Sequence, residues 1–247
     1  MRNTLWWVGG LSVLLLGALG GSGEAAEQAV AESIVVEDFE GYALGVPPYH
    51  WKRPHSKSRS VLDLPRVLDR DDSYFEIVEQ GGSKRVRAYT RDKYVQIVRL
   101  NGKSYQWDLR THPRLTWQWR AERLPAGAHE DKDKYNDVGG AVYVTFDSKD
   151  WLGRPRSIKY TYSSTLPVGT TVRYGALRVI VVASAVDGIG EWVRIERDVV
   201  ADYRRLYRRD PPNRPLFIAL WGDSDTTGGV SDVYFDDIEL LATADGR

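Results

Sequence analysis

The sequence predicts an all-β protein, a single jelly-roll-like β-sandwich of about ten antiparallel strands with one short helix. Short runs rich in β-branched and aromatic residues recur along the chain, and glycine, proline and asparagine separate them at the regular spacing of a sandwich or barrel. The chain contains no cysteine, which excludes disulfides, thiolate metal sites and cysteine nucleophiles. Stability must come from a core, and 247 residues are enough for one sandwich.

The predicted strands are short segments in which polar and apolar residues alternate or β-branched residues cluster. Gly81-Gly82 separates two of them and Asn101-Gly102 ends a third, and such dipeptides are strong signals for hairpin turns. The strands are expected at residues 34–42, 74–79, 84–90, 94–100, 115–122, 140–147, 156–164, 177–184, 191–197, 216–222 and 233–241.

One helix is expected shortly before residue 210. Asp198 can cap its first turn, and the prolines at 211–212 stop it. Tyr203, Leu206 and Tyr207 follow i, i+3, i+4 spacing, which predicts that this face packs onto the sandwich.

The first residues have the three parts of a secretory signal peptide. Arg2 is followed by an apolar run over residues 5–19 and then by small residues up to a predicted cut after Ala25. The uninterrupted run is shorter than the ~20 residues that span a bilayer. We therefore expect a periplasmic or secreted protein with no integral membrane segment after cleavage.

This division leaves one folded unit. The expected parts are a signal peptide at 1–25, a disordered leader at 26–33, the β-sandwich at 34–241 and a C-terminal tail at 242–247.

Charge and motifs exclude several classes of function. The chain has 34 basic and 34 acidic residues, so nothing directs it to nucleic acid. It lacks the G-x-S-x-G, H-E-x-x-H, P-loop and dinucleotide-binding patterns. His112 is a candidate base, but no nucleophile accompanies it in the sequence.

Two acidic loops are candidate ligand-binding sites. Asp223 and Asp225 occupy the first and third positions of a calcium-loop pattern with Gly228 at the sixth, but Tyr234 stands where the pattern needs a glutamate. The alternative is that both aspartates form a turn with their own backbone. The other loop carries Asp131 and Asp133, alternating with lysines that can neutralise them. If the two loops converge in space, a shared site is expected.

A second acidic grouping joins the two ends of the domain. Glu37 and Glu40 lie at the first strand, and Asp236 and Asp237 lie in the last. These ends resemble β-sandwich carbohydrate-binding modules in which structural Ca²⁺ joins the first strand to the last. Buried carboxylates are costly without a cation, so we expect a tentative calcium site here. The alternative is a structural seam in which backbone amides hold the carboxylates.

Aromatic residues outside the strands are candidates for stacking on sugar rings. Tyr49 and Trp51 lie in a proline-containing loop, and Trp151 lies in a second loop. A loop tryptophan can stack on a sugar or fold down over the edge of the sandwich. Aromatics within strands, such as Trp117 and Trp119, are expected in the core because they share a face with aliphatic residues.

The order of several motifs in the second half resembles a known family. The motifs are DVGGAVYVTFD, IKYTYSS, RDVVADYRRLY followed by two prolines, and FIALWGDSDTTGGVSDVYFDDIEL. Together they resemble the bacterial secreted family called domain of unknown function 3047, over roughly residues 38–241. The resemblance implies a jelly-roll or galactose-binding-like sandwich and an extracytoplasmic setting. It implies no established activity.

Three functions remain open at this point. The first is a non-catalytic sandwich that binds carbohydrate or another cell-envelope ligand, with calcium as its only expected cofactor. The second is a polysaccharide lyase or glycoside hydrolase on the same scaffold. The third is a scaffold or assembly protein of the envelope. A fold of this kind hosts many functions, so the site must decide.

Overall fold

A computed structural model describes residues 32–55 and 60–243, which form two β-sheets packed face to face. The predicted signal peptide lies outside the described residues, as do 26–31 of the predicted leader and 244–247 of the predicted tail. Within the described ranges, no helix is long and apolar enough to cross a bilayer.

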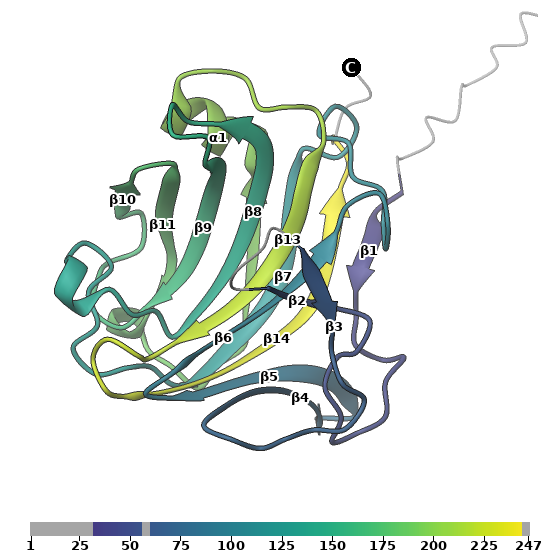
Figure 1. Cartoon of the computed structure of the whole chain (residues 1–247), viewed down its shortest axis with the longest axis vertical. Coiled ribbons are helices and arrows are strands. Elements are labelled where there is room, and N and C mark those ends of the chain that lie inside the picture. The colour runs from purple at the N-terminus through teal and green to yellow at the C-terminus, as the bar shows by residue number, and fades with distance from the viewer. Residues whose placement is uncertain (1–31, 56–59, 244–247) are drawn as a thin grey trace, which may run out of the picture.

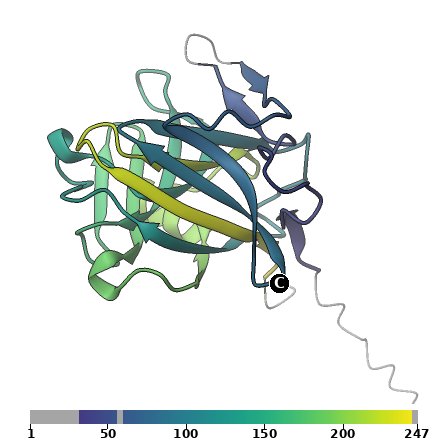
Figure 2. The same ribbon diagram turned by 90° about the horizontal axis from the view of Figure 1, so that it is seen from below.

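The first sheet has six strands and contains both ends of the domain. Its order is β12 (Val193–Asp198), β7 (Arg114–Arg123), β14 (Val230–Leu241), β5 (Ser83–Arg91) and β4 (Ser73–Gln80), with β1 (Ile34–Glu37) also paired to β14. Figure 2 shows the last strand, in yellow, beside blue strands from the first half of the chain.

The second sheet has eight strands and faces the viewer in Figure 1. Its order is β10 (Thr171–Tyr174), β11 (Leu177–Ser184), β9 (Pro155–Ser163), β8 (Gly140–Lys149), β13 (Pro215–Asp223), β6 (Tyr94–Leu100), β2 (Lys52–Pro54) and β3 (Val61–Asp63).

The predicted fold class is confirmed, with two additions. Each predicted strand forms, and three short strands, β2, β3 and β10, join them. The pairing is antiparallel except between β9 and β11, which run parallel. After β9 the chain crosses to β10 and returns through a turn at Gly175, whose φ is +55°. The returning strand, β11, then inserts beside β9 in the same direction.

The predicted helix is α1 (Val199–Tyr207). The Asp198 carboxylate accepts a hydrogen bond from the backbone N–H of Ala201 at 2.8 Å, as an N-cap should. The helix ends at Arg208, which has left-handed backbone angles, three residues before the prolines. Tyr203 and Tyr207 are buried against the sandwich, which confirms the predicted apolar face. The short 3₁₀ turns η1 (Asp133–Tyr135) and η2 (Ala185–Asp187) lie in loops.

The core lies between the two sheets and is rich in aromatic rings. Trp117 and Trp119 on β7 meet Tyr160 and Tyr162 on β9, with ring centroids 5.5 and 5.3 Å apart. All four side chains are buried. These contacts join the sheets and confirm that the strand tryptophans are core residues.

Candidate functional site

The face of the eight-stranded sheet that points away from the core, called the outer face here, carries the most unusual side chains. Strand residues alternate between the two faces of a sheet. On β8, Val142 and Val144 belong to the core cluster, so Tyr143 between them lies on the outer face. By the same alternation Lys159 of β9 and Trp221 of β13 lie on that face.

Three aromatic residues form a row across this face, called the aromatic strip. Trp221 stacks on Tyr94 of β6 with a centroid distance of 5.3 Å and an interplanar angle of 14°. Its other neighbour is Tyr143, at 5.5 Å and 39°. The Tyr94 side chain is 50% exposed, so the strip reaches solvent at its β6 end.

Lys159 lies beside the strip on the outer face. It is paired in register with Tyr143 on the neighbouring strand. Its Nζ lies 5.4 Å from the Tyr143 ring centroid and 6.0 Å from that of Trp221, within the range of cation–π attraction. Lys159 is only 5% exposed, which makes it an unusual buried cation.

The end of the outer face near the start of β8 holds three aspartates, called the acidic corner. Asp137, Asp223 and Asp225 each place one carboxylate oxygen within 4.8 Å of the others. Asp137 also accepts hydrogen bonds from the backbone N–H groups of Thr226 and Thr227, at 3.0 and 2.6 Å. The two acidic loops therefore converge, which meets the condition set for a shared site.

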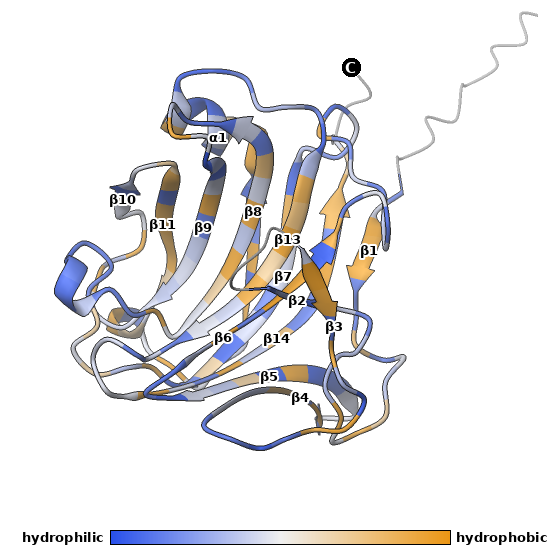
Figure 3. Cartoon of the chain, viewed as in Figure 1, coloured by the Kyte–Doolittle hydropathy of each residue, from blue (hydrophilic) through white to orange (hydrophobic). Residues whose placement is uncertain are grey.

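The residue that joins the loops was not among the predicted ones. Asp131 and Asp133 are exposed on the loop that carries η1, which is largely hydrophilic in Figure 3. Asp137, four residues beyond Asp133, makes the contacts instead. Because its partners include backbone N–H groups of the other loop, no residue pattern within its own loop could reveal it.

Burial controls the electrostatics of the acidic corner. It raises the pKa of Asp223 to about 7, Lys159 opposes the shift, and Asp225 and Asp137 add to it. The nearby Glu130 is also buried, which raises its pKa, although the Ser163 hydroxyl donates a hydrogen bond to it at 2.7 Å. Asp223 and Glu130 therefore keep their protons up to a higher pH than ordinary carboxyl groups do.

Glycine allows the corner to form. A Cβ on Gly139 would overlap the Leu124 side chain. Glycine at this position therefore lets the chain between Asp137 and the start of β8 pack closely against Leu124. The adjacent Val138 carbonyl then accepts the N–H of Asp223 at 3.0 Å. Gly228 has a φ of +69°, which supplies the sharp turn predicted at the sixth position of the loop.

The acidic corner has part of the chemistry of a calcium site. Carboxylate oxygens are suitable ligands, but calcium takes six to eight oxygens. Among the described residues, the three acidic side chains that lie close enough together to share an ion are those of Asp137, Asp223 and Asp225. Further ligands would have to be carbonyl groups or water.

Among the described residues, the four predicted calcium ligands of the first and last strands do not come together to share one ion. β1 does pair with β14, but Glu37 accepts hydrogen bonds from Arg99 at 2.7 Å and from Tyr42 and Trp51 at 3.0 Å each. These donors occupy the carboxylate in place of a metal. Glu40 accepts bonds from the Ser83 hydroxyl and the Lys84 N–H.

The last-strand carboxylates also have separate partners. Arg85 donates to Asp236 at 3.0 Å, and the Gln118 amide donates to Asp237 at 2.6 Å. Burial still raises the pKa of Asp236 to about 6, with Asp237 adding to the shift. The four predicted ligands are thus a structural seam held by side-chain donors together with backbone N–H groups.

Trp51 is a core residue, which favours the second of its two predicted roles, a side chain that folds down onto the sandwich. Its side chain has 0% exposure, and its indole N–H is the one bonded to Glu37. No ring face is left for a sugar. Tyr49 is partly buried, with the Arg66 guanidinium 4.5 Å from its ring centroid, so one face of it is covered.

Trp151 lies in the turn between β8 and β9 and is 89% exposed. It lies at the end of β8 opposite the acidic corner, because β8 begins beside that corner and ends at this turn. Its role as a sugar platform stays a prediction.

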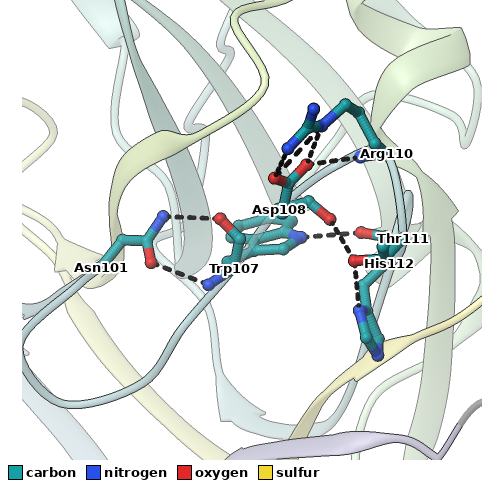
Figure 4. Close-up of polar contacts among 6 residues, drawn as sticks. All are labelled: Asn101, Trp107, Asp108, Arg110, Thr111 and His112. Carbon is teal, nitrogen blue, oxygen red and sulfur yellow. Dashed lines mark hydrogen bonds and ion pairs between the residues drawn. The ribbon is translucent and has the colours of Figure 1, made fainter.

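His112 belongs to a turn held by local hydrogen bonds (Figure 4). Its backbone carbonyl accepts the indole N–H of Trp107 at 2.8 Å, and Asn101 bonds both backbone groups of Trp107. The ring Nδ1 lies 2.9 Å from the Thr111 hydroxyl, which also donates to the Asp108 carbonyl. These contacts stabilise the turn that contains His112, and they do not form a catalytic pair.

A cleft of about 710 Å³ adjoins the aromatic strip. Tyr94, Gln96 and Trp221 line one side of it, and residues of β2, β3 and the segment before β4 line the other. The cleft extends the strip beyond the edge of β6.

A family model described as "Protein of unknown function (DUF3047)" matches residues 65–239, more than half of the chain. The chain belongs to the DUF3047 family. The resemblance in the order of motifs is thereby confirmed. No curated protein matches the sequence.

Solved structures similar to this DUF3047 protein include the following two. The family 11 carbohydrate-binding module of the Clostridium thermocellum cellulase Lic26A-Cel5E is 11% identical, covers 86% of this chain and 95% of its own, and has a TM-score of 0.41. The K1 cleaved adhesin domain of Lys-gingipain from Porphyromonas gingivalis W83 is 12% identical, with 86% and 99% coverage and a TM-score of 0.36. At these values the similarity says nothing about a ligand.

Several residues of the DUF3047 protein's outer face were missed in the sequence, although a signal was present. In GAVYVTFD, valine and phenylalanine occupy every second position, which leaves Tyr143 as the aromatic residue on the opposite side. In IKYTYS, Lys159 stands between two core residues in the same way. A large or charged residue at an outward position of a central strand was therefore the signal.

Proposed function

We propose that this chain is a non-catalytic, extracytoplasmic carbohydrate-binding protein whose ligand lies across the aromatic strip. The observation that carries the proposal is the row formed by Tyr94, Trp221 and Tyr143 on the sheet face that points away from the core. Packing between the sheets does not require aromatic rings on this face. Adjacent aromatic rings beside polar groups on a sheet face are typical of a ligand site.

The chemistry of the strip suits a sugar. Aromatic rings offer apolar surface to the C–H faces of a sugar ring, while hydroxyl groups need nearby donors and acceptors. Gln96 and the phenol of Tyr94 supply polar groups at the β6 end, and Asp223, which is paired in register with Tyr94, supplies a carboxyl group near the same end. Strands lie about 4.8 Å apart, so the strip spans roughly 10 Å, and the cleft continues it.

The extracytoplasmic setting is supported by the signal pattern at 1–25. Mass spectrometry of protein recovered from the periplasm or medium tests it. A mature N-terminus at Ala26 is the expected result, and an intact Met1 in the cytoplasm would contradict it.

Calcium at the acidic corner is part of the proposal. A bound divalent cation would offset the repulsion among Asp137, Asp223 and Asp225 and fix the two loops beside the strip. Its role would be structural, because it would join two loops that contribute to the edge of the outer face.

The experiment that tests carbohydrate binding compares two tyrosines that are equally exposed. Tyr94, on the strip, and Tyr135, on η1, are each 50% exposed. Wild-type protein, Tyr94→Ala and Tyr135→Ala are titrated calorimetrically against a panel of envelope and plant polysaccharides. We expect Tyr94→Ala to weaken binding about 10-fold, or about 1.4 kcal/mol, and Tyr135→Ala to bind like wild type. Absence of binding across the panel, or equal loss in both variants, would reject the proposal.

A glycoside hydrolase or lyase is the second candidate, and Asp223 is the observation that favours it. A carboxyl with a pKa of about 7 beside a sugar-binding face could act as a general acid. Product release from the bound polysaccharide tests this. Turnover that Asp223→Asn abolishes would replace the binding function with a catalytic one.

A further inference from the structure

Lys159 is a buried cation without an anionic partner. Within the part of the chain that the structure describes, no carboxylate oxygen lies within 4.0 Å of its ammonium group. Its contacts are the rings of Tyr143 and Trp221 and a hydrogen bond to the Tyr143 hydroxyl, whose pKa it lowers against the effect of burial. Aromatic rings attract a cation but do not neutralise it, and a buried unpaired charge is costly to the fold.

One further donor nearby lacks a partner. The indole N–H of Trp221 is buried without a hydrogen-bond partner among the described residues, whereas the Thr161 hydroxyl lies beside the Glu130 carboxyl and lowers its pKa by a hydrogen bond. In register across the sheet, Ala141 lies between Thr161 and Trp221, and Lys159 lies two residues before Thr161 on the same strand. The donor groups of Lys159, Thr161 and Trp221 therefore surround Ala141, whose side chain is a single methyl group.

The nearest carboxyl groups do not form an ion pair with Lys159. Asp223 and Glu130 feel its charge, yet each is buried, which raises its pKa. Neither group is within ion-pair distance of the Lys159 ammonium, so the lysine keeps its uncompensated charge.

We infer that Lys159 recognises a carboxylate on the ligand and that the saccharide bound by the outer face is a uronic acid polymer. This inference rests on the proposed function. The ligand carboxylate forms a charge-assisted hydrogen bond with Lys159, and the sugar ring to which it belongs lies against Trp221. The cost of burying the lysine is already met in the fold, so the ion pair adds to binding.

The composition of the face argues against nucleic acid. Among the described residues, Lys159 contacts the strip and Arg53 lines the adjoining cleft, whereas a nucleic-acid site presents several lysines or arginines along the backbone path. Sulfated glycans carry an anion of different shape, and they are one arm of the test.

The test uses polymers that differ only in charge. Polygalacturonate and alginate are each compared in the free-acid and esterified forms, with a sulfated galactan as a third ligand, by calorimetry at pH 7 with EDTA present. EDTA prevents a cation at the acidic corner from bridging protein and ligand. The proteins are wild type, Lys159→Met and Lys159→Arg, and circular dichroism checks that each variant is folded.

We expect wild type to bind at least one free-acid polymer 10-fold or more tightly than its ester and than the sulfated galactan. Lys159→Met should lose this preference, and Lys159→Arg should keep part of it. Equal binding of acid and ester, a preference for the sulfated polymer, or a preference that survives in Lys159→Met would overturn the inference. If Lys159→Met does not fold, the acid and ester comparison on wild type still decides.

The two proposals fail in different ways. Tyr94-dependent binding of neutral glycans alone would leave the proposed function standing and reject the role of Lys159. Absence of binding to any glycan would reject the proposed function itself.

Discussion

The seam between the first and last strands and the acidic corner are two groups of carboxylates that the structure treats in opposite ways. In the seam, Glu37 pairs with Arg99 and Asp236 with Arg85. In the acidic corner, Asp137 caps the opposite loop while Asp223 and Asp225 have no arginine or lysine within ion-pair distance among the described residues. Both groups look alike in the sequence.

The difference lies in the source of the compensating charge. A carboxylate with its own arginine is satisfied by the fold, so removing it damages the fold. A carboxylate crowded by other carboxylates costs stability in the ionised form, so removing it should help the fold and harm whatever uses the charge. The seam is therefore structural, and the corner is the better functional candidate.

Glu37→Gln is expected to have the largest effect on stability. It leaves Arg99 buried without its anion, which costs about 3–5 kcal/mol, or roughly 10 °C in Tm for a domain of this size. Thermal and urea unfolding measure it. The matched control is Glu40→Gln, on the same segment but exposed, for which a change below about 1 kcal/mol is expected. Similar losses in both variants would contradict a structural seam.

Asp223→Asn should change the pH dependence of stability. The folded-state pKa of Asp223, about 7, exceeds its ordinary value of 3.8. Between these values the folded state holds the proton and the unfolded state releases it, so stability falls as pH rises from about 4 to 7. Asp225, Asp137, Lys159 and Tyr143 surround the group and set the size of the effect.

The variant is therefore expected to be more stable than wild type by about 1–3 kcal/mol at pH 8 and equal to it below pH 4. Urea unfolding at both pH values measures this in the presence of EDTA. Asp225→Asn, at an exposed position, serves as the control and should show a smaller gain. A wild type that is more stable than Asp223→Asn at pH 8 would mean that the corner is a satisfied structural site.

Calcium should stabilise the wild-type protein at a pH where the aspartates of the acidic corner are ionised. Three carboxylates supply about half of the ligands that calcium needs, so binding in the 10⁻⁴–10⁻³ M range is expected. Added CaCl₂ at 10 mM should then raise stability by about 1–3 kcal/mol at pH 8 and leave Asp223→Asn unchanged. If calcium still stabilises Asp223→Asn but no longer stabilises Asp236→Asn, the calcium site lies at the seam between the first and last strands instead.

Much of the fold was predictable because it depends on local patterns. The alternation of residues located the long strands, and Asp198 located the start of the helix within one residue. β2 and β3 escaped prediction because three residues are too few to show a period, and β2 contains Pro54. β9 and β11 run parallel, so no hairpin turn joins them directly. The sequence therefore gives no turn signal for their pairing.

The site was less predictable because it combines distant segments. Asp223 and Asp225 were singled out by their spacing, but their third partner, Asp137, is joined to them only through tertiary contacts. Trp51 looked like an open loop residue because the sequence cannot show that Glu37 and Arg99 meet it in the core. Alternation on β8 and β13 did contain the signal for Tyr143 and Trp221.

The most direct test of the account is to find which tryptophan meets the ligand. Indole N–H signals of ¹⁵N-labelled protein are followed by NMR during titration with the tightest-binding polysaccharide fragment, with Trp221→Phe and Trp151→Phe assigning the two signals. The account predicts that the Trp221 signal shifts in proportion to bound ligand while the core signals of Trp117 and Trp119 stay in place. A shift confined to Trp151, with Trp221 unmoved, would place the ligand at the β8–β9 turn and contradict a binding site on the outer face.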